Sequence, residues 1–109
     1  MPQLKWYRVF KSPQEANDRI PQGKLQLVRI GERRICIAHT DRGFHAVSDV
    51  CPHLSESLSK GSTNYLNEII CPWHGYRFNL VHGQECQNRT KALTVYKIEL
   101  RDDGLFLGV

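Results

Sequence analysis

Short hydrophobic runs recur along the whole chain and are separated by polar segments. Apolar and polar positions alternate in "WYRVF" (6–10) and "LTVYKIEL" (93–100), whereas the apolar run is nearly continuous in "RICIAH" (34–39). Runs of this length, rich in Val, Ile, Leu and aromatic residues, are typical of β-strands. The sequence therefore predicts a series of short strands. Further runs of the same kind lie at 25–30, 44–49, 67–72, 76–81 and 105–109.

Turn signals stand between these runs at close intervals. Gly31-Glu32, Asp41-Arg42-Gly43, His82-Gly83 and Asp103-Gly104 each place a glycine between two predicted strands. Glycine supplies the positive φ that tight antiparallel hairpins require. The pattern therefore predicts an all-β fold, an antiparallel sandwich or barrel.

One segment looks helical and one looks irregular. At 12–20, Ser12 can cap a helix, Pro13 suits its first position, and Glu15 completes a capping box. Residues 50–67 are rich in Ser and Asn and are too polar for a strand pair; long loops of this kind are usually functional. At 109 residues, we expect one domain spanning 1–109.

Charge and hydropathy limit the possible partners. The net charge is +4, and the excess lies in residues 1–34, where eight Lys and Arg face three Asp and Glu. No basic motif interleaved with aromatics is present, so we expect no nucleic-acid partner. No run approaches the roughly 20 apolar residues of a membrane span, and the N-terminus lacks a secretory signal. We expect a soluble cytoplasmic protein that does not bind membranes.

Two short segments each combine a cysteine and a histidine. Cys51 and His53 are separated by one residue, and Cys71 and His74 by two. A proline follows each cysteine and narrows the backbone choices, so one tight turn can aim both side chains at a metal. This pairing suits metal binding in a reducing compartment better than disulfides. We call 51–56 and 71–76 the first and second hooks.

The identity of the metal is not settled by residue type alone. Two Cys and two His could form a tetrahedral zinc site, although zinc fingers usually pair Cys with Cys and His with His. The mixed hooks would also let the cysteines bind one iron and the histidines another, as in [2Fe–2S] centres where two His replace two Cys on one iron. Cys36 is expected to be a small buried side chain in a strand, and Cys86 a free thiol near a turn.

The two hooks resemble the cluster-binding boxes of the Rieske ferredoxins. "CPHLSESLSKG" is similar to the first box, C-x-H with a following Leu-Ser-x-Gly, and "CPWHGYRFNL" is similar to the second. The resemblance is to the soluble, low-potential members that serve ring-hydroxylating dioxygenases. It implies a base of antiparallel β-sheets with a cluster-binding subdomain inserted at about 50–78, and one [2Fe–2S] cluster per chain.

Carried over residue by residue, the resemblance implies four cofactor ligands. Cys51 and Cys71 would bind the inner iron, and His53 and His74 the outer, more exposed iron, through Nδ1. The large dioxygenase subunits append a catalytic domain, and we expect none in this chain. The chain also lacks a Gly-x-Gly-x-x-Gly fingerprint. We therefore expect an electron-transfer protein without catalytic residues.

The resemblance also bears on partners. The first hypothesis is a one-electron shuttle, a monomer that docks transiently near Leu54 and Trp73 with a reductase and with a terminal oxygenase or similar redox enzyme. The alternative is a bound small subunit of a larger reductase, such as assimilatory nitrite reductase. Such subunits often lack the cluster ligands, and all four are present here. A zinc module serving only as an interaction domain is the third possibility.

The positions around the boxes bear on the reduction potential. High-potential relatives carry an extra cysteine in each box, joined as a disulfide, and a Ser and a Tyr whose hydroxyls donate to cluster sulfur. Here those positions hold Glu56, Trp73, Tyr76 and Phe78. Fewer donors stabilise the reduced cluster less, so the resemblance implies a low potential.

Overall fold

The computed structural model describes residues 4–53 and 55–109, so Leu54, part of the predicted docking region, lies outside the described residues. The elements are β1 (Trp6–Phe10), α1 (Pro13–Arg19), β2 (Leu25–Ile30), β3 (Arg33–Thr40), β4 (Gly43–Ser48), the 3₁₀ helix η1 (Leu58–Lys60), β5 (Ser62–Thr63), β6 (Glu68–Ile70), β7 (Arg77–Asn79), β8 (Val95–Arg101) and β9 (Gly104–Gly108). None of the helices in this described part has the length and hydropathy needed to cross a membrane.

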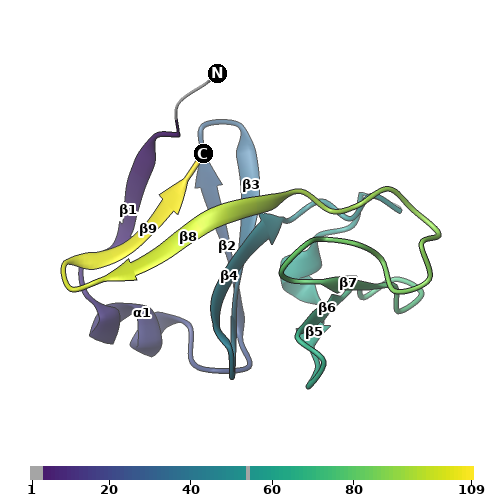
Figure 1. The fold of residues 1–109 in the computed structure, drawn as a ribbon, viewed down its shortest axis with the longest axis horizontal. Helices are drawn as coiled ribbons and strands as arrows, with labels where there is room; N and C mark the ends of the chain where they lie inside the picture. Colours follow the sequence, from purple (N-terminus) through teal and green to yellow (C-terminus); the bar gives the residue numbers. More distant parts are fainter. Residues whose placement is uncertain (1–3, 54) are drawn as a thin grey trace.

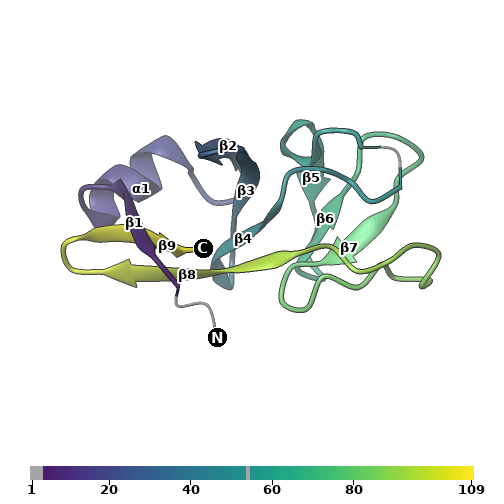
Figure 2. The same ribbon diagram turned by 90° about the horizontal axis from the view of Figure 1, so that it is seen from above.

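The strands form two antiparallel sheets. The larger has the order β1-β9-β8-β4-β3-β2 and curls into a half-barrel, which we call the base; the smaller has the order β5-β6-β7. In Figure 1, α1, β1 and β9 lie on the left and the small sheet on the right, and Figure 2 shows the same separation from above. The predicted all-β fold is confirmed.

The predicted strands and turns match the observed elements closely. Each apolar run contains a strand, and tight turns join β2 to β3, β3 to β4 and β8 to β9 at three of the four predicted sites. The His82-Gly83 turn does not join two strands: it brings Glu85 back to a bridge with Phe78, and β8 begins only at Val95. The elements that the pattern missed are η1 and β5, which have three and two residues. Segments this short contain too few positions to show a period.

The helix α1 begins with the N-cap that its sequence predicts. The Ser12 hydroxyl accepts a hydrogen bond from the Glu15 backbone N–H at 3.0 Å. The Glu15 carboxylate in turn accepts from the backbone N–H of Lys11 at 3.1 Å. The reciprocal bond therefore goes to the residue before the N-cap, one position away from the capping box that we expected.

Strands β3 and β4 separate two hydrophobic cores. On β3, Ile35 and Ile37 point into the core of the base, whereas Cys36 and Ala38 point into a second core that includes Cys51, Cys71 and Phe78. All four of these β3 side chains are fully buried. Because successive side chains of a strand face opposite sides, one strand serves both cores. The hooks are thus packed directly against the base.

Candidate metal centre

Matching backbone bonds close the two hooks. The Cys51 N–H donates to the Glu56 carbonyl at 2.9 Å, and the Cys71 N–H donates to the Tyr76 carbonyl at 2.8 Å. In the second hook, His74 and Gly75 have φ values of 65° and 68°. Glycine adopts this left-handed region freely, whereas histidine adopts it at some cost. The turn that aims His74 therefore depends on Gly75 and on the closing bond.

The two cysteine thiols lie together at the buried end of the hooks. Cys51 and Cys71 are at most 1 % exposed. Burial raises the pKa of the Cys71 thiol to about 11, the backbone N–H of Trp73 bonds to this sulfur and opposes the rise, and the hydrogen-bonded Cys51 thiol adds to it. Two adjacent buried thiolates would repel each other without a cation, and a bound metal would supply that positive charge.

The two histidines lie at the outer end of the hooks. Their rings are 5.3 Å apart between centroids, at an interplanar angle of 61°. His74 is exposed and His53 is partly buried. The Nδ1 atom of His53 is buried and makes no hydrogen bond. Buried polar atoms in proteins usually have a partner, so this nitrogen is available to bind a metal, although Nε2 of His45 is likewise unpaired.

These four side chains fit a cluster that needs two sulfur and two nitrogen ligands. The sulfur pair is buried, the nitrogen pair lies toward the surface, and one nitrogen is buried without a partner. Within residues 4–53 and 55–109, no three Cys, His, Asp or Glu side chains converge as they would around a single metal ion. The evidence that these residues fit a cluster of more than one metal ion is therefore the buried thiol pair and the unpaired Nδ1 of His53.

A buried carboxylate that the sequence analysis did not identify holds the segment that follows the first hook. Asp49 is fully buried. Its side chain accepts from the Ser57 hydroxyl, from the Ser59 N–H at 2.7 Å and from Arg34 at 3.2 Å. Its backbone carbonyl accepts from the Leu58 N–H at 2.7 Å. Asp49 thus joins the end of β4 to η1, and no local sequence signal indicates contacts over this distance.

A close backbone contact joins η1 to the small sheet. A Cβ atom on Gly61 would lie 1.9 Å from the carbonyl oxygen of Ile70, on β6. Real Cβ atoms do not approach oxygen so closely, so only glycine fits here. The Gly of the Leu-Ser-x-Gly pattern therefore allows the segment after the first hook to pack against the strand before the second hook.

The remaining predicted positions surround the hooks. Trp73 is 53 % exposed and packs edge-on against His74, with centroids 5.9 Å apart. Phe78 is fully buried, below both cysteines in the same core. Cys36 is a buried side chain in β3, as predicted, and Cys86 is the predicted free thiol, which is exposed.

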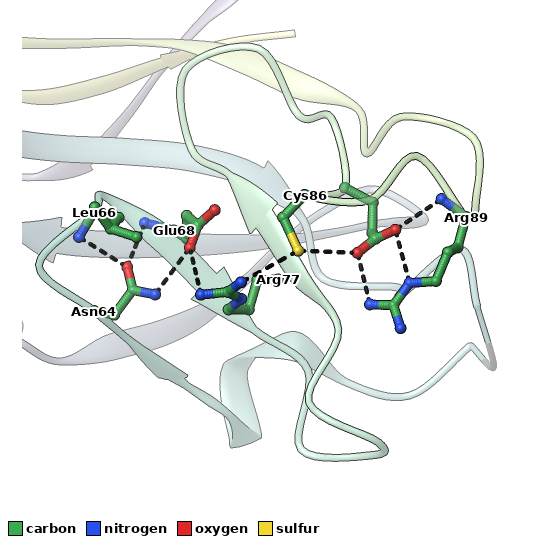
Figure 3. A network of polar contacts seen from close by, with 7 residues as sticks. Asn64, Leu66, Glu68, Arg77, Cys86 and Arg89 are labelled. Atoms are coloured by element: carbon green, nitrogen blue, oxygen red, sulfur yellow. Dashed lines mark hydrogen bonds and ion pairs between the residues drawn. The ribbon is translucent and has the colours of Figure 1, made fainter.

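A polar network runs alongside the small sheet. Figure 3 shows contacts that link Asn64, Glu68 and Arg77, continue to Cys86, and end at Arg89. The buried carboxylate of Glu85 bonds to both Cys86 and Arg89. Glu85 and Arg89 lie outside the hooks in sequence, and the analysis of the sequence did not identify them.

Comparison with known proteins defines the class. Residues 5–97 match the Rieske [2Fe–2S] domain, and the chain belongs to this family. It is 25 % identical over 93 residues to the ferredoxin component of the alkene monooxygenase system of Xanthobacter autotrophicus, covering 85 % of this chain and 76 % of the relative. The cofactor of the family is the [2Fe–2S] cluster that the resemblance implied.

Solved structures agree on the fold. A chain in the complex of reduced oxygenase and oxidized ferredoxin in carbazole 1,9a-dioxygenase is 25 % identical, with a TM-score of 0.78, covering 93 % of this chain and 99 % of that one. A candidate NADH-dependent nitrite reductase small subunit from Mycobacterium tuberculosis is 17 % identical, with a TM-score of 0.82, covering 99 % and 97 %. The second likeness shows the fold alone.

Proposed function

We propose that Cys51, Cys71, His53 and His74 hold the [2Fe–2S] cluster of this Rieske protein. The observation that carries the assignment is the arrangement of two buried thiols beneath two imidazoles, contributed by two hooks of matching geometry. The unpaired Nδ1 of His53 supports it further. When bound, such a cluster accepts and releases one electron at a time.

We infer that the protein carries electrons to an oxygenase. Several relatives are ferredoxin components of oxygenase systems, and similar chains occur in complexes of an oxygenase with its ferredoxin. The proposed histidine ligands lie at the exposed end of the hooks, which gives an electron a short exit to a partner. In this role the chain orients the cluster ligands and shields the buried thiols from solvent, and the oxygenase carries out the substrate chemistry.

The finer assignments concern the partners and the location. We propose that a reductase supplies the electron, that docking is transient and centred on Trp73 and the neighbouring Leu54, and that the carrier is a monomer. The exposure of Trp73 beside His74 supports this docking site. Four free thiols suit a reducing compartment, and we propose the cytoplasm. We also propose that 50–78 forms the cluster-binding subdomain within one domain.

The second candidate function is the small subunit of a larger reductase. It is favoured by the likeness in fold to a nitrite reductase small subunit. The two candidates differ in how tightly the protein is held, because a subunit copurifies with its enzyme and a shuttle dissociates. The full set of four candidate ligands supports the shuttle.

The test of the proposed function is spectroscopic and then kinetic. Purified protein should be reddish, contain about two irons per chain, and show two imidazole nitrogens coupled to the reduced cluster in pulsed EPR. Protein with one zinc and no colour would contradict the ligand assignment. Reduced protein should then be oxidised by an oxygenase purified from the same source, in a reaction that saturates with oxygenase concentration. Stable copurification with a large reductase would instead support the second candidate.

A further inference from the structure

The ring of His53 is stacked on a neighbouring aromatic ring. His53 and Tyr76 are parallel to within 8°, with centroids 3.9 Å apart. Tyr76 is the last residue of the second hook, whereas His53 belongs to the first, so this contact joins the two hooks. Stacking engages one face of the imidazole and leaves its ring nitrogens, including the unpaired Nδ1, free along the edge.

The other face of Tyr76 is covered by a cation. The guanidinium carbon of Arg89 lies 3.7 Å from the Tyr76 ring centroid. His53 and Arg89 both lie within 4 Å of this centroid, and two groups cannot share one face at that distance, so they take opposite faces. A planar guanidinium over an aromatic ring gains both stacking and cation–π attraction. Tyr76 is therefore clamped between the two side chains.

We call the stack of His53, Tyr76 and Arg89 the clamp, and a buried carboxylate fixes its Arg89 end. Glu85 is 2 % exposed and receives three hydrogen bonds from Arg89: from the backbone N–H at 2.8 Å, from Nε at 3.1 Å and from Nη2 at 2.7 Å. Bonds from Arg89 hold the pKa of Glu85 well below its ordinary value, so the carboxylate stays charged at neutral pH. Glu85 itself forms a β-bridge with Phe78 of β7. Arg89 is therefore fixed to the small sheet.

We propose that Arg89, anchored by Glu85, is a positioning residue that acts through Tyr76 to fix the ring orientation of His53 as a cluster ligand. The inference rests on the proposed function, because it takes His53 to bind iron. Groups that orient a metal-ligating histidine commonly hydrogen-bond its second nitrogen. Here Tyr76 restrains the face of the His53 ring, and Arg89, which follows the second hook in sequence, holds Tyr76 in place.

The inference can be tested with variants that remove single parts of the clamp. Arg89→Gln removes the planar cation, Arg89→Lys keeps the charge but not the bidentate bonds to Glu85, and Tyr76→Leu removes the stacked ring while Tyr76→Phe keeps it. The chain offers a matched control in Arg101, which pairs with Glu99 and lies 5.0 Å from the Trp6 ring, on the base. Arg101→Gln removes a comparable contact far from the hooks.

The main measurement is pulsed EPR of the reduced holoprotein carrying ¹⁵N-labelled histidine. Arg89→Gln and Tyr76→Leu should change or broaden the coupling of one imidazole nitrogen and leave the other unchanged, whereas Tyr76→Phe and Arg101→Gln should match the wild type. Arg89→Lys should lie between wild type and Arg89→Gln. Loss of the cluster to a chelator should be about tenfold faster in Arg89→Gln, as for other groups that support metal ligands.

The outcomes separate this inference from the proposed function. If the wild type shows two imidazole couplings and these stay unchanged in Arg89→Gln, the inference is wrong and the ligand assignment stands. If the wild type shows no imidazole coupling, the ligand assignment itself is wrong, and the inference fails with it. Should Arg89→Gln not yield holoprotein, Arg89→Lys and Tyr76→Leu decide: couplings identical to the wild type in both would overturn the inference.

Discussion

At the scale of single residues, the chemistry around the hooks depends on which charges are buried and where they lie. The Glu56 carboxylate contributes to the raised pKa of the Cys71 thiol, after burial and the Cys51 thiol, so it opposes negative charge on that sulfur. Phe78, which is buried beneath the hooks, has no hydroxyl to donate. Both features disfavour an added electron on the cluster, because reduction increases its negative charge.

The first prediction is a low reduction potential. With few donors to sulfur and a carboxylate nearby, the midpoint should lie near the bottom of the Rieske range of about −150 to +300 mV. Protein-film voltammetry at neutral pH measures it, and Glu56→Gln should raise it. A wild-type midpoint above roughly +100 mV would contradict both the hydrogen-bond argument and the assignment to the low-potential ferredoxins.

A second prediction concerns His45 on β4. Burial lowers the pKa of His45 below its ordinary 6.5, and the nearby Arg42 and His39 lower it further. Folded protein therefore disfavours the charged form, so the stability associated with neutral His45 is present above pH 6.5 and is lost as the pH falls below it.

Urea denaturation at pH 7.5 and pH 5.5 measures whether the free energy of unfolding falls as the pH is lowered. His45→Leu should reduce the loss of stability on acidification relative to the wild type, and it also removes the buried, unpaired Nε2 atom. An equal loss in wild type and His45→Leu would show that His45 does not carry this effect.

At the scale of elements, the hooks differ from the strands that support them. The described hook residues are closed by a few backbone bonds and contribute Cys51, Cys71 and Tyr76 to the second core, whereas the base has a larger share of strand residues in its own core. Metal ligation can supply the missing free energy of ordering in such segments.

The third prediction is that the cluster organises residues 50–78. Cys71→Ser should abolish the cluster and increase amide exchange in this range, while strands of the base keep their protection. The measurement is hydrogen exchange followed by mass spectrometry, with Cys86→Ser as a control that should retain the cluster. Protection in 50–78 equal to that of the holoprotein would show that the metal does not order this segment.

Features that depend on residues close together in the sequence could be predicted, whereas contacts between distant residues could not. Strands such as β3 and β8 are long enough for their apolar pattern to identify them, and the hooks concentrate four ligand-type residues in two short motifs. The roles of Asp49 and Arg89 could not be predicted, because their partners Ser57 and Tyr76 lie 8 and 13 positions away in irregular segments. No periodic pattern reports such contacts.

At the scale of the whole molecule, charge and exposure are distributed unevenly. The basic excess lies in the N-terminal third of the sequence, whereas the charges within 51–78 balance. The small sheet and the hooks lie at one end of the molecule, opposite β1 and α1 (Figure 2). A partner that docks on the hooks therefore meets the exposed Trp73 and a surface on which the charges of residues 51–78 balance, with Lys91 beside the first hook.

The fourth prediction follows from this distribution. Trp73→Ala should weaken binding to the oxygenase by roughly tenfold, about 1.4 kcal/mol, since exposed aromatic residues often dominate small interfaces. Salt should weaken binding only mildly. The measurement is calorimetry or transfer kinetics at two ionic strengths.

Tyr65→Ala is the matched control for this prediction. Tyr65 is 82 % exposed and lies beside Asp41 of the base, so its removal should leave binding unchanged. A steep loss of binding with salt would instead place the docking surface on the basic N-terminal third.

The placement of β3 between two cores also affects how fast the protein can exchange electrons. The hooks pack on a strand whose central residues, 35–38, are buried on both faces, and close-packed interiors resist compression. We therefore expect the atoms around the proposed ligands to move little when an electron arrives. Small nuclear displacements mean a low reorganisation energy, which permits rapid transfer at a small driving force. A carrier mounted in this way can exchange electrons during brief encounters and does not require a long-lived complex.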